Sequence, residues 1–171
     1  MDCDRTVLRI GARTGAPSRE SQLFMKITEA LLAEHLVFHN LFDHVETTAP
    51  STQTIGELKT MAALLDAVLR AHTRTEDELF MGPLEQCFEQ IGHRETFHQE
   101  HEEIDEILGQ LQKTLDADQA RELLLGVIVL CRQHFDKEER IVFPMAEALL
   151  KGETLTQLGQ TWMDQRVRSA K

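Results

Sequence analysis

The chain has 171 residues, of which 42% are hydrophobic and 27% are charged, and its formal net charge is −11. These values are typical of one globular domain with a substantial core, and they exclude wholesale disorder. The negative charge argues against nucleic acid and anionic membranes as partners, because both bind basic surfaces.

The first elements are an arm and a long helix. Residues 1–17 hold a short β-like run followed by two glycines and a proline, so we expect an N-terminal arm there. Residues 18–171 are then expected to form the single domain. Ser18 can cap a first helix that runs to about Glu46 and ends before Pro50.

The second and third helices carry apolar residues at helical spacing. Thr54 and Glu57 have the spacing of a capping box and begin the second helix, whose stripe reaches Leu79. The third helix is predicted from about His93 to Leu115, and its stripe is the most regular in the chain. Both helices should therefore turn one face toward a common core.

The remaining chain adds two helices. A fourth helix begins after Asp116, carries its stripe through Ile141 and is expected to bend near Pro144. Thr154 then opens a short fifth helix. Because the connections between the first four helices are short, neighbours should be antiparallel. The sequence predicts an all-α fold, an up-down-up-down four-helix bundle with a short C-terminal fifth helix.

Six metal-binding side chains lie on these apolar stripes. Four helices each carry a histidine, and two of them carry a glutamate four residues later. The residues are His35, His72, Glu76, His101, His134 and Glu138. Positions i and i+4 lie about 40° apart around a helix, so each HxxxE pair can serve one centre. Burying six such groups is very costly without a cation among them, so we predict that they bind metal.

The spacing of the six residues is nearly regular. The same interval separates His72 from His134 and Glu76 from Glu138, which indicates a duplicated helix pair. If both glutamates bridge two metals, each metal gains two imidazoles and two carboxylate oxygens and keeps an open position for a diatomic or peroxide. Imidazole with carboxylate suits iron, zinc or manganese, and bridging carboxylates in a helix bundle favour two irons.

Simpler interpretations remain open. One histidine on an apolar face is usually a core residue, so a metal-free structural bundle with a buried polar network is an alternative. His39 lies one turn after His35 and is considered a reserve ligand, while His98 is considered an outer contact. His44 and His93 are expected at the surface or at helix ends.

Acidic residues also lie next to the predicted ligands. Asp77 and Glu139 follow their histidines at i+5 and are expected to point away from the stripe. Glu34 and Glu100 precede histidines and are expected either to accept hydrogen bonds from the ligands or to be solvated. Without metal, the two buried ligand carboxylates should repel each other, which would raise their pKa values.

The pattern resembles the hemerythrin-like (HHE cation-binding) domain family over about residues 20–150. Four segments carry the resemblance: Leu31–His35 (LLAEH), His72–Phe80 (HTRTEDELF), Glu100–Ile104 (EHEEI) and His134–Pro144 (HFDKEERIVFP). The resemblance implies a non-haem di-iron site in a four-helix bundle that binds O2, NO or related species.

The ligand set of this chain differs from that of the oxygen-carrying members of the family at two positions. Those carriers use five histidines, whereas Phe97 stands here at the place of the additional third-helix histidine. Glu138, four residues after His134, replaces an aspartate found five residues after. The four-histidine, two-glutamate set is closest to the di-iron repair proteins for damaged iron centres. Those usually carry an additional cysteine-bearing N-terminal region, and the arm here has only Cys3.

The resulting expectation is a cytoplasmic protein with two carboxylate-bridged, non-haem irons that binds or senses O2, NO or peroxide. Repair of iron centres, with iron–sulfur proteins as partners, is its most concrete version. A passive oxygen-binding or iron-holding module is the alternative. The cytoplasmic location is expected because the sequence shows neither a signal-peptide core nor an apolar run long enough for a membrane span. No nucleophile motif or phosphate loop supports an enzyme acting on an organic substrate.

Overall fold

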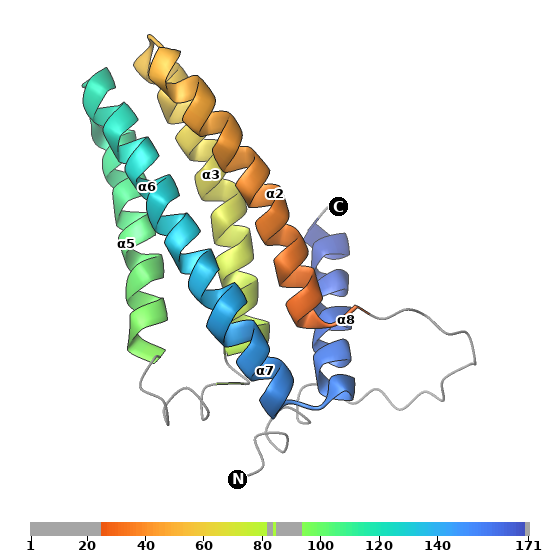
Figure 1. The fold of residues 1–171 in the computed structure, drawn as a ribbon. Helices are drawn as coiled ribbons and strands as arrows, with labels where there is room; N and C mark the ends of the chain where they lie inside the picture. The colour runs from red at the N-terminus through yellow and green to blue at the C-terminus, as the bar shows by residue number, and fades with distance from the viewer. Residues whose placement is uncertain (1–24, 82–83, 85–93, 170–171) are drawn as a thin grey trace.

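The computed structural model describes residues 25–81, 84 and 94–169, and these residues build an all-α protein (Figure 1). Four long helices alternate in direction and form the bundle. They are α2 (Ile27–Thr48), α3 (Ile55–Thr75), α5 (Arg94–Lys113) and α6 (Ala117–Lys137). The predicted up-down-up-down bundle is confirmed. The predicted arm, residues 1–17, lies outside the described residues.

Capping side chains set the starts of two helices. Thr54 accepts a hydrogen bond from the backbone N–H of Glu57 at the start of α3, as predicted. Asp116 accepts two backbone hydrogen bonds at the start of α6. The first bundle helix differs from its prediction, because Lys26 is extended and α2 begins at Ile27. A continuous helix from Ser18 is therefore wrong, and Ser18 itself lies outside the described residues.

Two of the bundle helices widen into π-helical segments at one end of the bundle. Glu76–Met81 (η2) follows α3, and Glu138–Val142 (η3) follows α6 and leads into α7 (Phe143–Leu149). The backbone N–H of Phe143 bonds to the carbonyl of Glu138, five residues earlier. In the sequence a proline follows each π segment by two residues. Proline disrupts α-helical hydrogen bonding, which favours a locally wider turn.

The π segment after α6 explains one error in the predicted stripe. Each i→i+5 turn holds one more residue than an α turn, so the inward face shifts along the sequence. Val142 is buried as a result, and Ile141, predicted inward, is 52% exposed. Leu115, the predicted end of the third helix, is 92% exposed, because α5 ends before it at Lys113.

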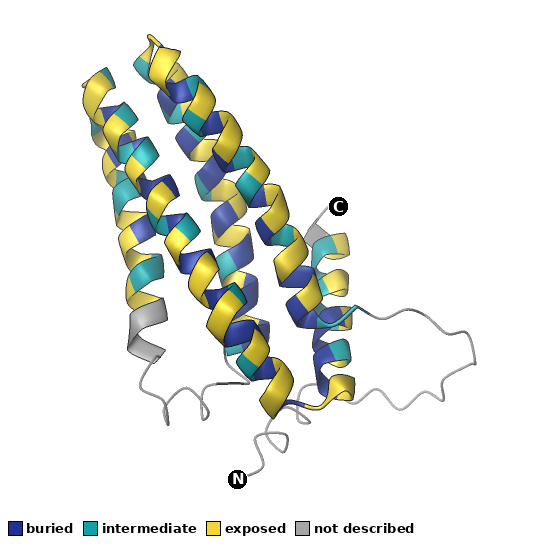
Figure 2. Ribbon diagram, in the orientation of Figure 1, coloured by how far each residue is buried: buried dark blue, intermediate teal, exposed yellow. Residues whose placement is uncertain are grey.

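Two apolar cores fill the molecule, and the buried faces of the bundle helices turn toward one another (Figure 2). The larger core includes Phe42 and Leu65 and lies between the four bundle helices. The smaller core includes Leu31 and Phe143 and extends to the C-terminal helix. On α2, His35 lies between residues of the two cores, which places the predicted metal ligands at their boundary.

The C-terminal helix α8 (Gly152–Ser169) packs along the first part of α2 (Figure 1). It begins two residues before Thr154 and buries Leu155 and Leu158 in the smaller core. A Cβ atom on Gly159 would lie 1.9 Å from the carbonyl oxygen of Met25, so this close approach requires glycine. Among the described helices, none has the length and apolar character needed to cross a membrane.

Candidate metal centre

The six predicted ligands meet inside the bundle at the boundary between the two cores. Four histidines come from the four bundle helices, and both glutamates are the first residues of the π segments. These residues are His35, His72, Glu76, His101, His134 and Glu138. Five are buried, and His101 is the most exposed of the six, with 11% of its side chain accessible. The helical stripes thus bring together the residues that the sequence singled out.

The histidines form two pairs whose Nε2 atoms face each other. His35 Nε2 lies 3.2 Å from His72 Nε2, and His101 Nε2 lies 2.8 Å from His134 Nε2. Each pair joins a histidine of the HxxxE type to a single histidine from a neighbouring helix. Each pair, together with both glutamates, offers four ligand atoms that lie within 4.8 Å of one another. The arrangement therefore provides two adjacent positions for a cation.

The two glutamates face both positions. Glu76 directs Oε1 toward His72 Nε2, at 3.3 Å, and Oε2 toward His101 Nε2, at 3.8 Å. Glu138 directs Oε1 toward His134 Nε2 and Oε2 toward His35 Nε2, each at 3.4 Å. One oxygen of each carboxylate thus points at each histidine pair, which is the geometry of a bridging ligand.

The carboxylate oxygens also test whether a cation fits here. All four oxygens of Glu76 and Glu138 are buried, and no hydrogen-bond donor among the described residues satisfies them. Buried polar atoms are almost always paired, and an isolated buried carboxylate is especially costly. Metal cations between the two histidine pairs would supply the missing partners. The donor set of imidazole and carboxylate fits such ions.

Further carboxylates contact the histidine rings at Nδ1, the nitrogen that faces away from the proposed metal positions. The Nδ1 atoms of three ligand histidines lie within hydrogen-bond distance of a carboxylate on another helix: His72 with Glu34 at 2.7 Å, His134 with Glu100 at 2.9 Å, and His35 with Glu139 at 2.9 Å. An Nδ1–H donated to a carboxylate leaves Nε2 free as a metal ligand and fixes the ring orientation. These partners prepare the rings for metal.

Asp77 and Glu139 correct an expectation from the sequence. Both were expected to point away from the site, yet Glu139 contacts His35 and Asp77 Oδ1 lies 3.9 Å from His101 Nδ1. The expectation considered each helix by itself, whereas Glu139 contacts a histidine of α2 and Asp77 lies near a histidine of α5. A sequence signal existed, because both HxxxE motifs are followed directly by an acidic residue.

Aromatic side chains enclose the His35–His72 position. The ring of Phe135 stacks on His35 with centroids 3.9 Å apart and planes 9° apart. Phe143 stacks on His35 from another direction, and Phe38 meets the edge of His72. This position is therefore shielded by apolar groups, which strengthen electrostatic attraction between its charges.

The charges of the site shift the pKa values of two histidines upward. Burial alone would lower the pKa of His72, but the charge of Glu76 and the hydrogen bond with Glu34 raise it to about 10. Burial likewise opposes protonation of His134, and the charge of Glu138 raises its pKa to about 10. Without metal, these two rings carry the positive charges that balance the buried carboxylates.

The pKa values of Glu138 and His101 shift downward. Burial alone would raise the pKa of Glu138, but the charge of His134 outweighs it and holds that pKa well below its usual range. The expectation of a raised pKa was therefore wrong for this carboxylate, because protonated histidines replace the metal as its partners. Burial and the nearby charge of His134 lower the pKa of His101.

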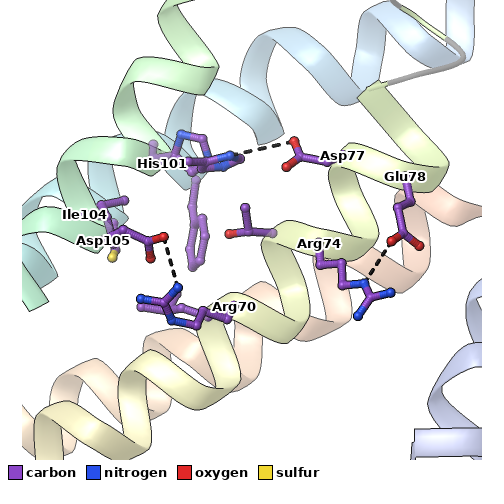
Figure 3. Close-up of a pocket in the computed structure, with 12 residues that line it drawn as sticks. Arg70, Arg74, Asp77, Glu78, His101, Ile104 and Asp105 are labelled. Carbon is purple, nitrogen blue, oxygen red and sulfur yellow. Dashed lines mark hydrogen bonds and ion pairs between the residues drawn. The ribbon is translucent and has the colours of Figure 1, made fainter. Parts of the chain in front are cut away.

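A pocket leads to the second histidine pair. Its volume is about 370 Å³, and His101 and His134 line it, together with groups from α3, α5 and α6. Figure 3 shows Asp77 on the side of His101, and the Arg70–Asp105 and Arg74–Glu78 ion pairs near the pocket. Neither His35 nor His72 reaches this pocket. The two positions therefore differ in access.

Comparison with known protein families agrees with this geometry. The sequence profile of the hemerythrin HHE cation binding domain matches residues 26–146. The chain belongs to the hemerythrin family. The match contains all six clustered ligands and ends before α8 begins. No curated protein and no solved structure matched the chain significantly.

The three remaining histidines that the structure describes belong to neither four-ligand group, although His39 Nε2 lies 3.7 Å from Oε1 of Glu139, the carboxylate beside His35. His39 Nδ1 accepts a hydrogen bond from Arg132 at 3.1 Å, and the ring is not part of either four-ligand group. His98 and His44 are exposed. His93 lies outside the described residues.

Proposed function

We propose that this hemerythrin domain is a cytoplasmic, non-haem di-iron protein that binds O2, NO or peroxide. The observation that carries the proposal is the pair of four-ligand groups sharing both glutamates. Each position would receive two nitrogens and two oxygens, a set that suits iron and leaves room for another ligand. Two irons held in this way supply redox chemistry with O2, NO or peroxide.

The protein's own residues would decide which position a small ligand reaches. Phe135 and Phe143 stack on His35, while the pocket is lined by His101 and His134. Acidic groups balance the two arginines that line the pocket, so it presents no excess of positive charge to attract anions. Neutral diatomics and hydrogen peroxide are therefore the favoured ligands of the proposal.

The experiment that tests the proposal starts from protein purified from iron-replete cells. Bound iron should come close to two ions per chain, and the optical spectrum should change reversibly when O2 or NO is added and removed. An iron-loaded protein whose spectrum does not respond to either gas or to peroxide would refute the ligand-binding role.

A second measurement separates ligand binding from iron repair. A repair protein must release iron, so reduced protein should transfer iron to an apo iron–sulfur protein, and Glu138→Gln should change the transfer rate. A ligand-binding module keeps its iron while the diatomic exchanges. Absence of transfer together with a stable, reversible adduct would rule out repair and support the binding module.

A further inference from the structure

The two halves of the metal centre use equivalent residues. Glu34 precedes His35 and holds Nδ1 of His72, just as Glu100 precedes His101 and holds Nδ1 of His134. Each of these glutamates is partly buried, with 19% of its side chain exposed. A cationic donor to the second oxygen fixes such a carboxylate through a charge-assisted hydrogen bond.

The two halves obtain that cation from different places. Lys137 donates to Glu100 Oε1 and belongs to α6, within the bundle. Arg166 Nε donates to Glu34 Oε1 at 2.7 Å and belongs to α8. The helix that provides Arg166 follows the segment that the family profile matches, which ends at residue 146.

Arg166 is held in place by several contacts. Its Nη1 atom donates to the carbonyl oxygen of Ala71, the residue before His72, at 3.1 Å. Its guanidinium carbon lies 5.8 Å from the centre of the Trp162 ring on the same helix. The guanidinium thus joins α8 to Glu34 on α2 and to the backbone of α3 beside a metal ligand.

We infer that Arg166 is a positioning residue for the His35–His72 metal position and that it couples the docking of α8 to metal binding there. Arg166 fixes Glu34, Glu34 fixes the ring of His72, and His72 Nε2 faces the cation. Loss of such an outer partner typically weakens metal binding about 10- to 100-fold. By reciprocity, metal at this position stabilises the docked helix.

Stepwise titration of the metal-free protein with Co²⁺, followed by its visible absorption, tests this inference. Arg166→Ala should weaken one of two binding steps about 10- to 100-fold and leave the other unchanged. Arg166→Lys should recover part of the loss, because the charge remains near Glu34. Arg168→Ala, a loss of charge at an exposed site on the same helix, should change neither step.

The affected position can be identified in a second background. His134→Ala removes a ligand of the other position, so one strong Co²⁺ site should remain, and adding Arg166→Ala should weaken that site. Lys137→Ala in the otherwise native protein should weaken the step that Arg166→Ala leaves intact. Equal weakening of both steps by Arg166→Ala, or a change below twofold in each, would overturn the inference.

Hydrogen exchange gives a readout that does not depend on affinity. Co²⁺ should slow amide exchange in α8 of the native protein and should slow it much less in Arg166→Ala. Equal protection in both proteins would contradict the coupling. The inference rests on the two-position site proposed above: a single Co²⁺ per native chain would overturn that site and the inference with it, whereas two unchanged steps in Arg166→Ala would overturn the inference alone.

Discussion

Metal must compete with protons for two of the four ligand histidines. The pKa values of His72 and His134 are both raised to about 10, so at neutral pH each ring holds a proton on the nitrogen that faces the metal. A metal ion binds only the deprotonated nitrogen. Since each position contains one of these rings, we expect each bound ion to release about one proton at pH 8.

The pKa values of His72 and His134 also determine how steeply metal affinity depends on pH. Between pH 7 and pH 9 the affinity for each ion should rise about tenfold per pH unit, because one proton is displaced per ion. Loading the metal-free protein with Zn²⁺ in weakly buffered solution containing a pH indicator measures the release directly. His134→Ala should release about one proton fewer than the native protein. Release close to zero at pH 8 in the native protein would refute the reasoning.

Metal affinity should rise with pH, whereas the stability of the metal-free protein should fall as the pH rises above neutral. The folded pKa values of His72 and His134 lie above the ordinary value of 6.5, so their contribution is complete below pH 6.5 and is lost toward pH 10. The lowered pKa of Glu138 contributes stability above its ordinary value of 4.5 and loses it in acid. The metal-free protein should therefore unfold at a lower urea concentration at pH 9.5 than at pH 6. In the metal-loaded protein, bound metal adds to the free energy of unfolding because it binds only the folded state. A metal-free protein that is more stable at pH 9.5 would contradict this balance.

Three further outcomes are expected. His134→Ala should lose most of the metal at its position, whereas His44→Ala, a change at an exposed site, should keep full metal content by elemental analysis. Phe135→Ala should lower the free energy of unfolding by about 3–5 kcal/mol, because it empties a buried site and removes the ring stacked on His35; a loss below 1 kcal/mol in urea unfolding would contradict this. Thr73→Trp places a large ring in the pocket and should slow NO binding at least tenfold in stopped-flow measurements. The control variant Leu32→Trp changes a different pocket, away from His101, and should bind NO at the native rate. Equal rates in the two variants would show that ligands take another path.

The sequence was sufficient for the bundle and for the inward direction of the six ligands. In each helix the ligand occupies a position on an apolar stripe, so burial of the stripe also buries the ligand, as for His35 between Leu31 and Phe38. The HxxxE spacing then aligns both groups of one helix. Which histidines pair with each other depends on the packing of the helices, and the periodicity of single helices does not determine it.

The outer contacts of the site could not be predicted by assuming regular helices. Glu139 and Asp77 lie close to histidines of neighbouring helices, and the periodicity of their own helices does not show this. Arg166 lies far along the chain from Glu34, and its contact depends on how α8 docks. The pKa shifts depend on distances between helices, so the balance between Glu138 and His134 becomes visible only in the folded protein.

The most direct test of the central claim is a crystal structure of the iron-loaded protein with anomalous diffraction recorded at the iron absorption edge. The account predicts two anomalous peaks, one bound by Nε2 of His35 and His72 and one bound by Nε2 of His101 and His134. Both peaks should be bridged by the carboxylates of Glu76 and Glu138. A single peak, or a peak held by His39 instead of these pairs, would contradict the shared two-position centre.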